Sequence, residues 1–213
     1  MYFLNDKLKA IDLVGGNIAG KIHSVWPRQG PFGSSGGSLQ FLGRSGSYID
    51  LPLENKLDAK KSITLLAWVY PESAGPILDQ KTTGNGVNLW MGSPRKLVAL
   101  FVLRKGNVSN VFSLDTSSIT PLHWNFLGIS YNHAARKASL WVDGKLAAIK
   151  SIGDFKLDTK FPLRLGNRVE SSRHFRGRIA CLQVYDKALD SEQILAAKDL
   201  CWRSTRQKKH KIH

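Results

Sequence analysis

The sequence has few acidic residues, few cysteines and no long apolar run. Its 213 residues include only two cysteines and 16 acidic side chains. The longest apolar stretches, residues 65–70 and 97–103, have the length of β-strands, whereas a helix that spans a bilayer needs about 20 apolar residues. We therefore expect no membrane insertion. The composition, with 42% hydrophobic and 22% charged residues, is that of a globular protein.

Only four of the acidic residues are glutamates, which bears on catalysis. Glycoside hydrolysis needs two carboxyl groups about 5–9.5 Å apart across the bond to be cleaved. Alternate residues of a strand share one face, so a glutamate followed two residues later by an aspartate would place two such groups together. None of the glutamates has an aspartate at that position; they are Glu54, Glu72, Glu170 and Glu192. The sequence therefore predicts no catalytic residue and no enzyme.

The two cysteines, Cys181 and Cys201, restrict metal and redox chemistry. Two cysteines alone cannot form a structural zinc site, and no histidine lies at ligand spacing from either of them. Cys181 lies in an apolar segment and Cys201 at the end of an expected helix. The chain between them is long enough to turn back, so a bridge is geometrically reasonable. At this point two alternatives stay open: a disulfide, or a pair of buried free thiols.

Lysine and arginine outnumber the acidic residues 31 to 16 and give a formal net charge of +15. Part of the excess lies beyond Cys201, in a tail without acidic residues that contains Arg203, Arg206, Lys208, Lys209 and Lys211. A basic surface favours polyanionic partners, although a surface that only promotes solubility is the plainer interpretation. Nucleic acid is not expected as a partner, because no aromatic stacking platform is interleaved with the basic residues.

Short apolar segments separated by turn residues recur from residue 38 onward, as in an all-β sandwich. We expect strands at residues 38–42, 48–51, 63–70, 87–91, 97–103, 124–131, 138–142, 145–149, 163–165 and 178–185. Asp143-Gly144 tolerates the positive φ values of a type I′ hairpin turn. Asp190 and Gln193 have capping-box spacing and predict one helix over residues 190–200. Residues 30–38 predict a long loop, and the segment before them is left unassigned.

Six segments in order carry a family resemblance: GSLQFLGRSGSYIDLP (37–52), SITLLAWVYP (62–71), HWNFLGISY (123–131), ASLWVDGKL (138–146), PLRLGN (162–167) and FRGRIACLQVYDKALDSEQI (175–194). Together they resemble the laminin-G-like, pentraxin-related branch of the concanavalin-A-like jelly rolls. The resemblance implies an all-β fold, a two-sheet antiparallel jelly-roll sandwich with one short C-terminal helix. The resemblance covers roughly residues 37–201. We expect one domain over residues 1–201, followed by a basic tail over 202–213.

The resemblance also implies properties that the residues alone leave open. Members of this family often bridge the two cysteine positions, which favours the Cys181–Cys201 disulfide and an extracellular setting, secreted or in the ectodomain of a larger protein. No signal peptide is visible at the N-terminus, so the residues themselves leave a cytosolic setting open. Relatives often bind Ca²⁺, but the nearest oxygen-rich group (Asp79, Asn85, Asn88) lacks a second carboxylate. We predict no cofactor and assign no metal ligand, and a calcium site stays open.

We expect basic loops to bind acidic or sulfated glycans or glycoproteins, because arginine pairs bidentately with sulfate and carboxylate groups. The candidate residues are Arg104, Lys105, Arg168, Arg173, Arg176 and Arg178. The sequon at Asn107 predicts a glycosylation site. The function predicted is therefore a non-catalytic recognition or adhesion module. The alternative is a structural domain that contacts other proteins of the extracellular matrix or cell surface within a larger receptor or matrix protein.

Overall fold

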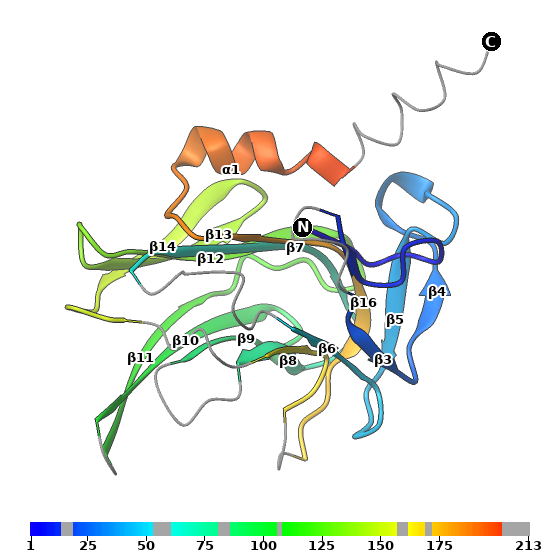
Figure 1. Cartoon of the computed structure of the whole chain (residues 1–213), viewed down its shortest axis with the longest axis horizontal. Coiled ribbons are helices and arrows are strands. Elements are labelled where there is room, and N and C mark those ends of the chain that lie inside the picture. The colour runs from blue at the N-terminus through cyan, green and yellow to red at the C-terminus, as the bar shows by residue number, and fades with distance from the viewer. Residues whose placement is uncertain are drawn as a thin grey trace.

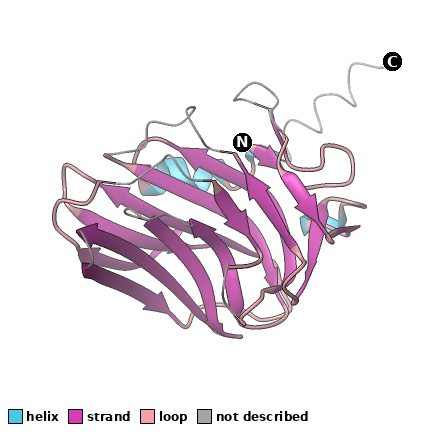
Figure 2. Ribbon diagram, turned by 60° about the horizontal axis from the view of Figure 1, so that its bottom comes forward, coloured by secondary structure: helices cyan, strands magenta, loops and turns pink. Residues whose placement is uncertain are grey.

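The computed structural model describes residues 1–13, 19–52, 61–80, 86–105, 108–156, 162–168 and 172–201. Within these ranges the chain forms two antiparallel sheets that face each other (Figures 1 and 2). The short helix α1 (Ser191–Ala197) lies against the outer face of one of them. This is the predicted all-β jelly-roll sandwich. No helix among the described residues is long and apolar enough to span a bilayer.

The sheet under α1 has nine strands. The order of neighbours is β14 (Lys145–Ser151), β13 (Lys137–Val142), β12 (Asn125–Asn132), β7 (Ile63–Pro71), β16 (Arg176–Tyr185), β1 (Tyr2–Phe3) and β2 (Ile11–Asp12). The long strand β16 also pairs with β5 (Ser38–Leu42), which pairs in turn with β4 (Trp26–Arg28). A 3-10 turn, η1 (Pro31–Gly33), lies between β4 and β5.

The opposite sheet has seven strands. They follow the order β11 (Val108–Thr116), β10 (Lys96–Lys105), β9 (Gly86–Ser93), β8 (Gly75–Gln80), β15 (Leu163–Leu165), β6 (Tyr48–Leu51) and β3 (Lys21–His23). Consecutive strands such as β12, β13 and β14 form hairpins, whereas β6 and β15 meet across more than 100 residues.

The main core fills the space between the sheets, and strand alternation explains which side chains enter it. In β7, Leu65 and Val69 lie in this core, whereas Leu66 and Trp68 point to the opposite face of the sheet. A residue pattern of period two places alternate side chains on opposite faces. The same alternation in the facing sheet contributes Phe101, so that both sheets bury one face against each other.

A second apolar cluster lies between the nine-stranded sheet and α1. Trp68 packs there with the helix residues Ile194 and Ala197. The Asp190 side chain accepts a hydrogen bond from the Gln193 backbone N–H at 2.8 Å, and the Gln193 side chain accepts from the Asp190 N–H, which confirms the predicted capping box.

The predicted disulfide is also present in this second cluster. Cys181 on β16 and Cys201 beyond α1 are bonded, with their Cα atoms 6.1 Å apart. Both cysteines are almost fully buried.

Most strands lie where the sequence predicts them, and the positive φ values at Asp143 and Gly144 fit the type I′ turn. Strand β12 begins at Asn125, one residue later than expected. Strands β8 and β11 and the four short strands β1 to β4 are not among those that the sequence predicts. The region between residues 30 and 38, expected to be a loop, contains the turn η1.

Candidate functional site

The structure separates the basic residues that the sequence proposes as one ligand-binding group. Arg176 and Arg178 lie on β16 in the nine-stranded sheet, and Arg173 is exposed just before that strand. Arg168 follows β15 in the seven-stranded sheet, and its Nε lies 3.9 Å from Asp79 on β8 of that sheet. Arg104 and Lys105 end β10 in the same seven-stranded sheet. Their side chains, and the predicted glycosylation site Asn107, lie outside the described residues.

Strand register brings Arg178 into a row of side chains across the nine-stranded sheet. Trp26 on β4 pairs with Gln40 on β5, Gln40 pairs with Arg178, and Arg178 pairs with Tyr70 on β7. Directly opposed residues of antiparallel strands project from the same face. That face is the outer one, because Val69, which precedes Tyr70 on β7 and points to the opposite face, lies in the main core. The row therefore presents two aromatic rings, an amide and a guanidinium toward the same side.

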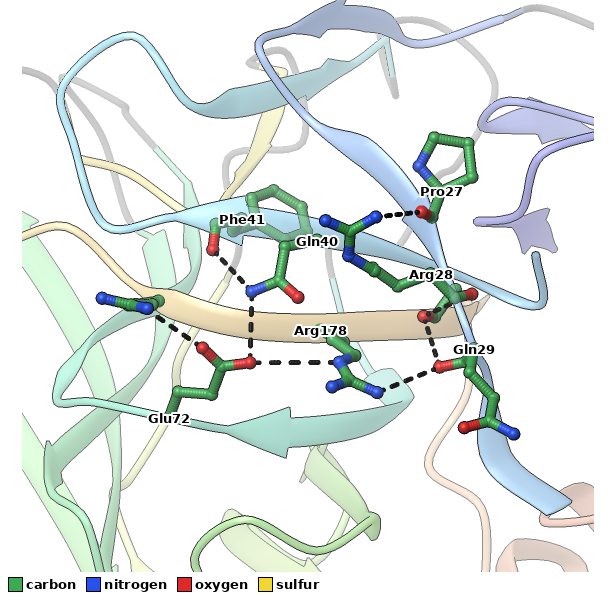
Figure 3. Close-up of polar contacts among 9 residues, drawn as sticks. Pro27, Arg28, Gln29, Gln40, Phe41, Glu72 and Arg178 are labelled. Carbon is green, nitrogen blue, oxygen red and sulfur yellow. Dashed lines mark hydrogen bonds and ion pairs between the residues drawn. The ribbon is translucent and has the colours of Figure 1, made fainter. Parts of the chain in front are cut away.

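Glu72, just after β7, connects the polar members of this surface (Figure 3). Its Oε1 accepts a hydrogen bond from Gln40 Nε2, and its Oε2 accepts one from Arg176 Nε, both at 3.2 Å. Arg178 Nε lies 3.9 Å from Oε1 and makes no hydrogen bond although it is buried. One carboxylate thus holds an amide and two guanidinium groups together.

Further contacts fix the position of Arg178. Its Nη1 donates to the backbone carbonyl of Gln29 at 3.5 Å, and its Cζ lies 4.5 Å from the centre of the Tyr70 ring. Tyr70 packs edge-on against Trp124, with ring centres 5.6 Å apart. A guanidinium over an aromatic face is attracted by the ring quadrupole. Arg178 is therefore a fixed charge, whereas Arg176, with 64% of its side chain exposed, reaches into solvent.

Arg28 and Trp26 on β4 extend this surface toward solvent. The Arg28 side chain donates a long 3.5 Å hydrogen bond to the carbonyl of the preceding Pro27, and among the described residues it forms no ion pair. Trp26 is 56% exposed. We name this surface the arginine platform and define it as Trp26, Arg28, Gln40, Glu72, Arg176 and Arg178. It carries three guanidinium groups and one carboxylate.

The described residues offer little that resembles a catalytic or metal centre. They contain no group of three histidine, cysteine or acidic side chains arranged to hold a metal ion. Residues 33–37 have the letters Gly-x-Ser-x-Gly, but they run from η1 toward β5, whereas a nucleophile elbow links a strand to a helix. Glu72, the acidic residue of the platform, is committed to Gln40 and two arginines.

Residues 43–195 match the family described as the concanavalin A-like lectin/glucanases superfamily. Because this match covers most of the chain, the protein belongs to that superfamily. No curated protein sequence matches the chain.

Solved structures with the same fold include toxin binding domains. The binding domain of Paraclostridial Mosquitocidal Protein 1 superposes with a TM-score of 0.71 at 16% identity, over 92% of this chain and 50% of that one. The botulinum neurotoxin serotype D binding domain gives 0.69 at 18% identity, over 92% and 50% respectively. The receptor binding domain of the botulinum neurotoxin C/D mosaic serotype gives 0.69 at 17%, over 92% and 49%. This chain thus spans about half the length of these neighbours, and at such identities the likeness concerns the fold.

Proposed function

Starting from membership of the concanavalin A-like lectin/glucanases superfamily, we propose that this domain is a non-catalytic recognition module that binds acidic or sulfated glycans through the arginine platform. The single observation that carries the proposal is the gathering of Arg176 and Arg178 around one glutamate, on the same face as exposed Arg28 and Trp26.

The chemistry of the platform favours an anionic ligand. The platform carries three guanidinium groups and one carboxylate, so a positive charge remains after Glu72 is paired with Arg176 and Arg178. Arginine presents a planar fork of N–H donors that matches the oxygens of sulfate and carboxylate. Arg176 and Arg28 are the exposed members and would make these contacts, while the more buried Arg178 adds fixed charge behind them.

Trp26 gives the proposal its carbohydrate component. The residue is 56% exposed and lies on the same face as Gln40 and Arg178. Large aromatic rings offer a flat apolar surface with a polar N–H edge, and the C–H face of a pyranose ring can pack on it. The Gln40 side chain is engaged by Glu72 and by the Phe41 carbonyl, so it supports the platform from below and need not contact the ligand.

Retention on immobilised heparin tests this proposal. The double variant Arg28→Gln/Arg176→Gln should elute at lower salt than the wild type. By the counterion-release argument, the slope of log K against log salt should fall by about two, because two ionic contacts are lost. The matched control is Arg95→Gln/Arg136→Gln, which removes two exposed arginines from other turns. Trp26→Ala should weaken retention with little change in slope, because stacking carries no counterions.

Two results would refute the proposal. Equal shifts in the platform and control variants would show that heparin responds to total charge alone. Elution of the wild type at low salt would show that the platform binds no sulfated chain at all.

A second candidate, a protein-interaction domain of a larger receptor or matrix protein, is favoured by another observation. Leu146 and Ile149 on β14 and Leu195 on α1 are 47%, 53% and 57% exposed, and exposed apolar groups of this size suit a protein partner. Low-salt elution from heparin would favour this candidate. We propose an extracellular setting for either function, supported by the disulfide, which is stable in an oxidising compartment.

A further inference from the structure

The edge strands of the two sheets differ in how they are protected against pairing with another chain. A strand with a neighbour on one side only presents unpaired backbone N–H and C=O groups, and proteins protect such edges by shortness, proline, lysine or a bulge. The edge strands β2, β3 and β4 have two or three residues each, and β4 contains Pro27. Edge strand β14 carries Lys145 and Lys150, and its pairing with β13 contains a register shift.

Strand β11 is the longest edge strand among the described residues, and it has none of these protections. It pairs with β10 from Val108 to Thr116 without a register shift. The strand contains no proline, lysine or arginine, and its one charged side chain, Asp115, forms an ion pair with Lys96 of β10. Val111, near its middle, is 55% exposed. A long, regular edge of this kind is a template for an added strand.

One amine from the opposite sheet reaches the edge of β11, on the side of the sandwich where β11 and β14 lie close together (Figure 1). Ala138, the partner of Lys150 in the β13–β14 register, belongs to the main core, so the Lys150 side chain points toward the seven-stranded sheet. Its Nζ donates to the backbone carbonyl of Ser113 at 3.4 Å, a long bond between exposed groups. Within the described part of the chain, Lys150 has no acidic partner. An acidic side chain can therefore still neutralise this charge.

The charge at this edge distinguishes a second copy of the chain from a different partner. Each copy has a formal net charge of +15. Two β11 strands paired about a two-fold axis near Ser113 would bring both Lys150 ammonium groups to the junction, and like charges across an interface disfavour such pairing. An extended segment with acidic side chains meets no such repulsion. Its N–H groups can take over the Ser113 carbonyl while a carboxylate pairs with Lys150.

The two faces of β11 specify the pattern of side chains in the added strand. Phe112 and its register partner Phe101 on β10 point toward the main core. The next pair, Val111 and Val102, therefore lies on the outer face. Apolar residues of an added strand would pack beside Val111 on that face. Residues that alternate with them would point to the other side, where Lys150 lies, and acidic side chains suit these positions.

We propose that β11 binds an extended segment of another protein, in which β-branched apolar residues alternate with acidic ones, as an additional strand of the seven-stranded sheet. Backbone hydrogen bonds to the edge supply affinity, and the contacts with Val111 and Lys150 supply selectivity. This site is independent of the arginine platform, which lies on the nine-stranded sheet.

Titration of the isotope-labelled full chain with a nonapeptide of alternating valine and glutamate tests this site. Two-dimensional amide NMR spectra should shift in residues 108–116 and at Lys150, and hydrogen exchange of the β11 amides should slow when the peptide binds. A nonapeptide with lysine in place of glutamate should bind about tenfold more weakly or worse, because its charges repel Lys150. N-methylation of the internal amides keeps the side chains but removes the backbone donors, and it should abolish detectable binding.

Substitutions in the protein locate the contact. Ser113→Glu places a carboxylate at the edge, where it repels an acidic strand and competes for Lys150, so binding should weaken by about tenfold or more. The matched control, Ser151→Glu, alters an exposed serine of edge strand β14 that points away from β11, since the adjacent Lys150 points toward it. This control should bind as the wild type does. Lys150→Gln should weaken binding about two- to fivefold, as expected for one exposed ion pair.

The platform variant Arg28→Gln/Arg176→Gln should also bind the glutamate peptide as the wild type does. Absence of shifts in β11 at a large excess of peptide overturns the proposal, as does an equal loss in Ser113→Glu and Ser151→Glu or a loss in the platform variant. A dimeric wild type in light scattering that Ser113→Glu makes monomeric would assign the edge to a second copy and also overturn it. Lys150→Gln alters an exposed side chain and remains informative even if Ser113→Glu proves unstable. None of these outcomes bears on the heparin result, so the two proposals fail separately.

Discussion

Reduction of the Cys181–Cys201 disulfide should lower the free energy of unfolding by about 3 kcal/mol. The bridge closes a loop with a sequence separation of 20, and the chain-entropy relation gives this magnitude for a loop of that length. The native state should change little, because α1 has other attachments. Trp68 Nε1 donates to the Lys198 carbonyl at 3.1 Å, and Gln183 Nε2 donates to that of Ala197 at 2.9 Å.

Equilibrium unfolding in guanidinium chloride, with and without a phosphine reductant, measures this effect on the wild-type chain. With a slope of roughly 4 kcal/mol per molar, the midpoint should fall by about 0.5–1 M. Near-UV circular dichroism of the reduced native protein should match that of the oxidised one. Reduction of the wild type leaves both buried sulfur atoms in place, so it avoids the cavities that alanine would create.

The double variant Cys181→Ala/Cys201→Ala is the control for the reductant, which should not affect its midpoint. A decrease in unfolding free energy below about 1 kcal/mol in the wild type would refute the loop-entropy reasoning. Loss of the near-UV signal on reduction would refute the expectation that the native state changes little. That result would show that α1 depends on the bridge to remain docked.

Three further substitutions test particular contacts. Burial, with a smaller contribution from Asp12, raises the pKa of Tyr2 to about 12. The neutral phenol therefore stabilises the fold fully below pH 10, and about 1–3 kcal/mol of stability should disappear as the pH rises toward 12. Tyr2→Phe should lose that part of the dependence in denaturation curves measured across this range. Gly166 has φ +82°, and an added Cβ would collide with the buried Phe41 ring, so Gly166→Ala should cost about 2–4 kcal/mol by chemical denaturation. The hydroxyl of buried Tyr131 donates to the Gly153 carbonyl at 2.8 Å and accepts from the Phe155 N–H at 2.9 Å. Tyr131→Phe should therefore lower stability by about 1–3 kcal/mol, and an unchanged midpoint would contradict this.

Local signals account for the parts of the fold that the sequence predicts well. The alternation in β7, the Asp143-Gly144 turn and the Asp190–Gln193 capping box each depend on residues close together in the chain. Strand β8 was missed because its first residues, Gly75 and Pro76, are typical of turns. Its pairing with β9 and β15 overrides that local preference.

The candidate sites depend on contacts that no local pattern contains. Arg176 and Arg178 stand out in the sequence, but the partner that organises them, Glu72, lies about 100 residues earlier. Trp26 and Arg28 lie on the platform because β4 pairs with β5. The sequence does not predict that short strand or its register. Trp26, Pro27 and Arg28 are all exposed and show no apolar–polar alternation, so this segment carries no local strand signal.

The contacts of Glu72 also bear on the rates at which a ligand would associate and dissociate. Fixing a free arginine side chain costs up to about 2 kcal/mol of rotamer entropy. Arg176 and Arg178 have already lost part of that freedom, because Glu72 holds both of them in the free protein. A polyanion would thus meet side chains already oriented, yet it would compete with a resident carboxylate for each of them. Such a surface suits fast, reversible contacts repeated along a polymer, and it disfavours a single long-lived complex.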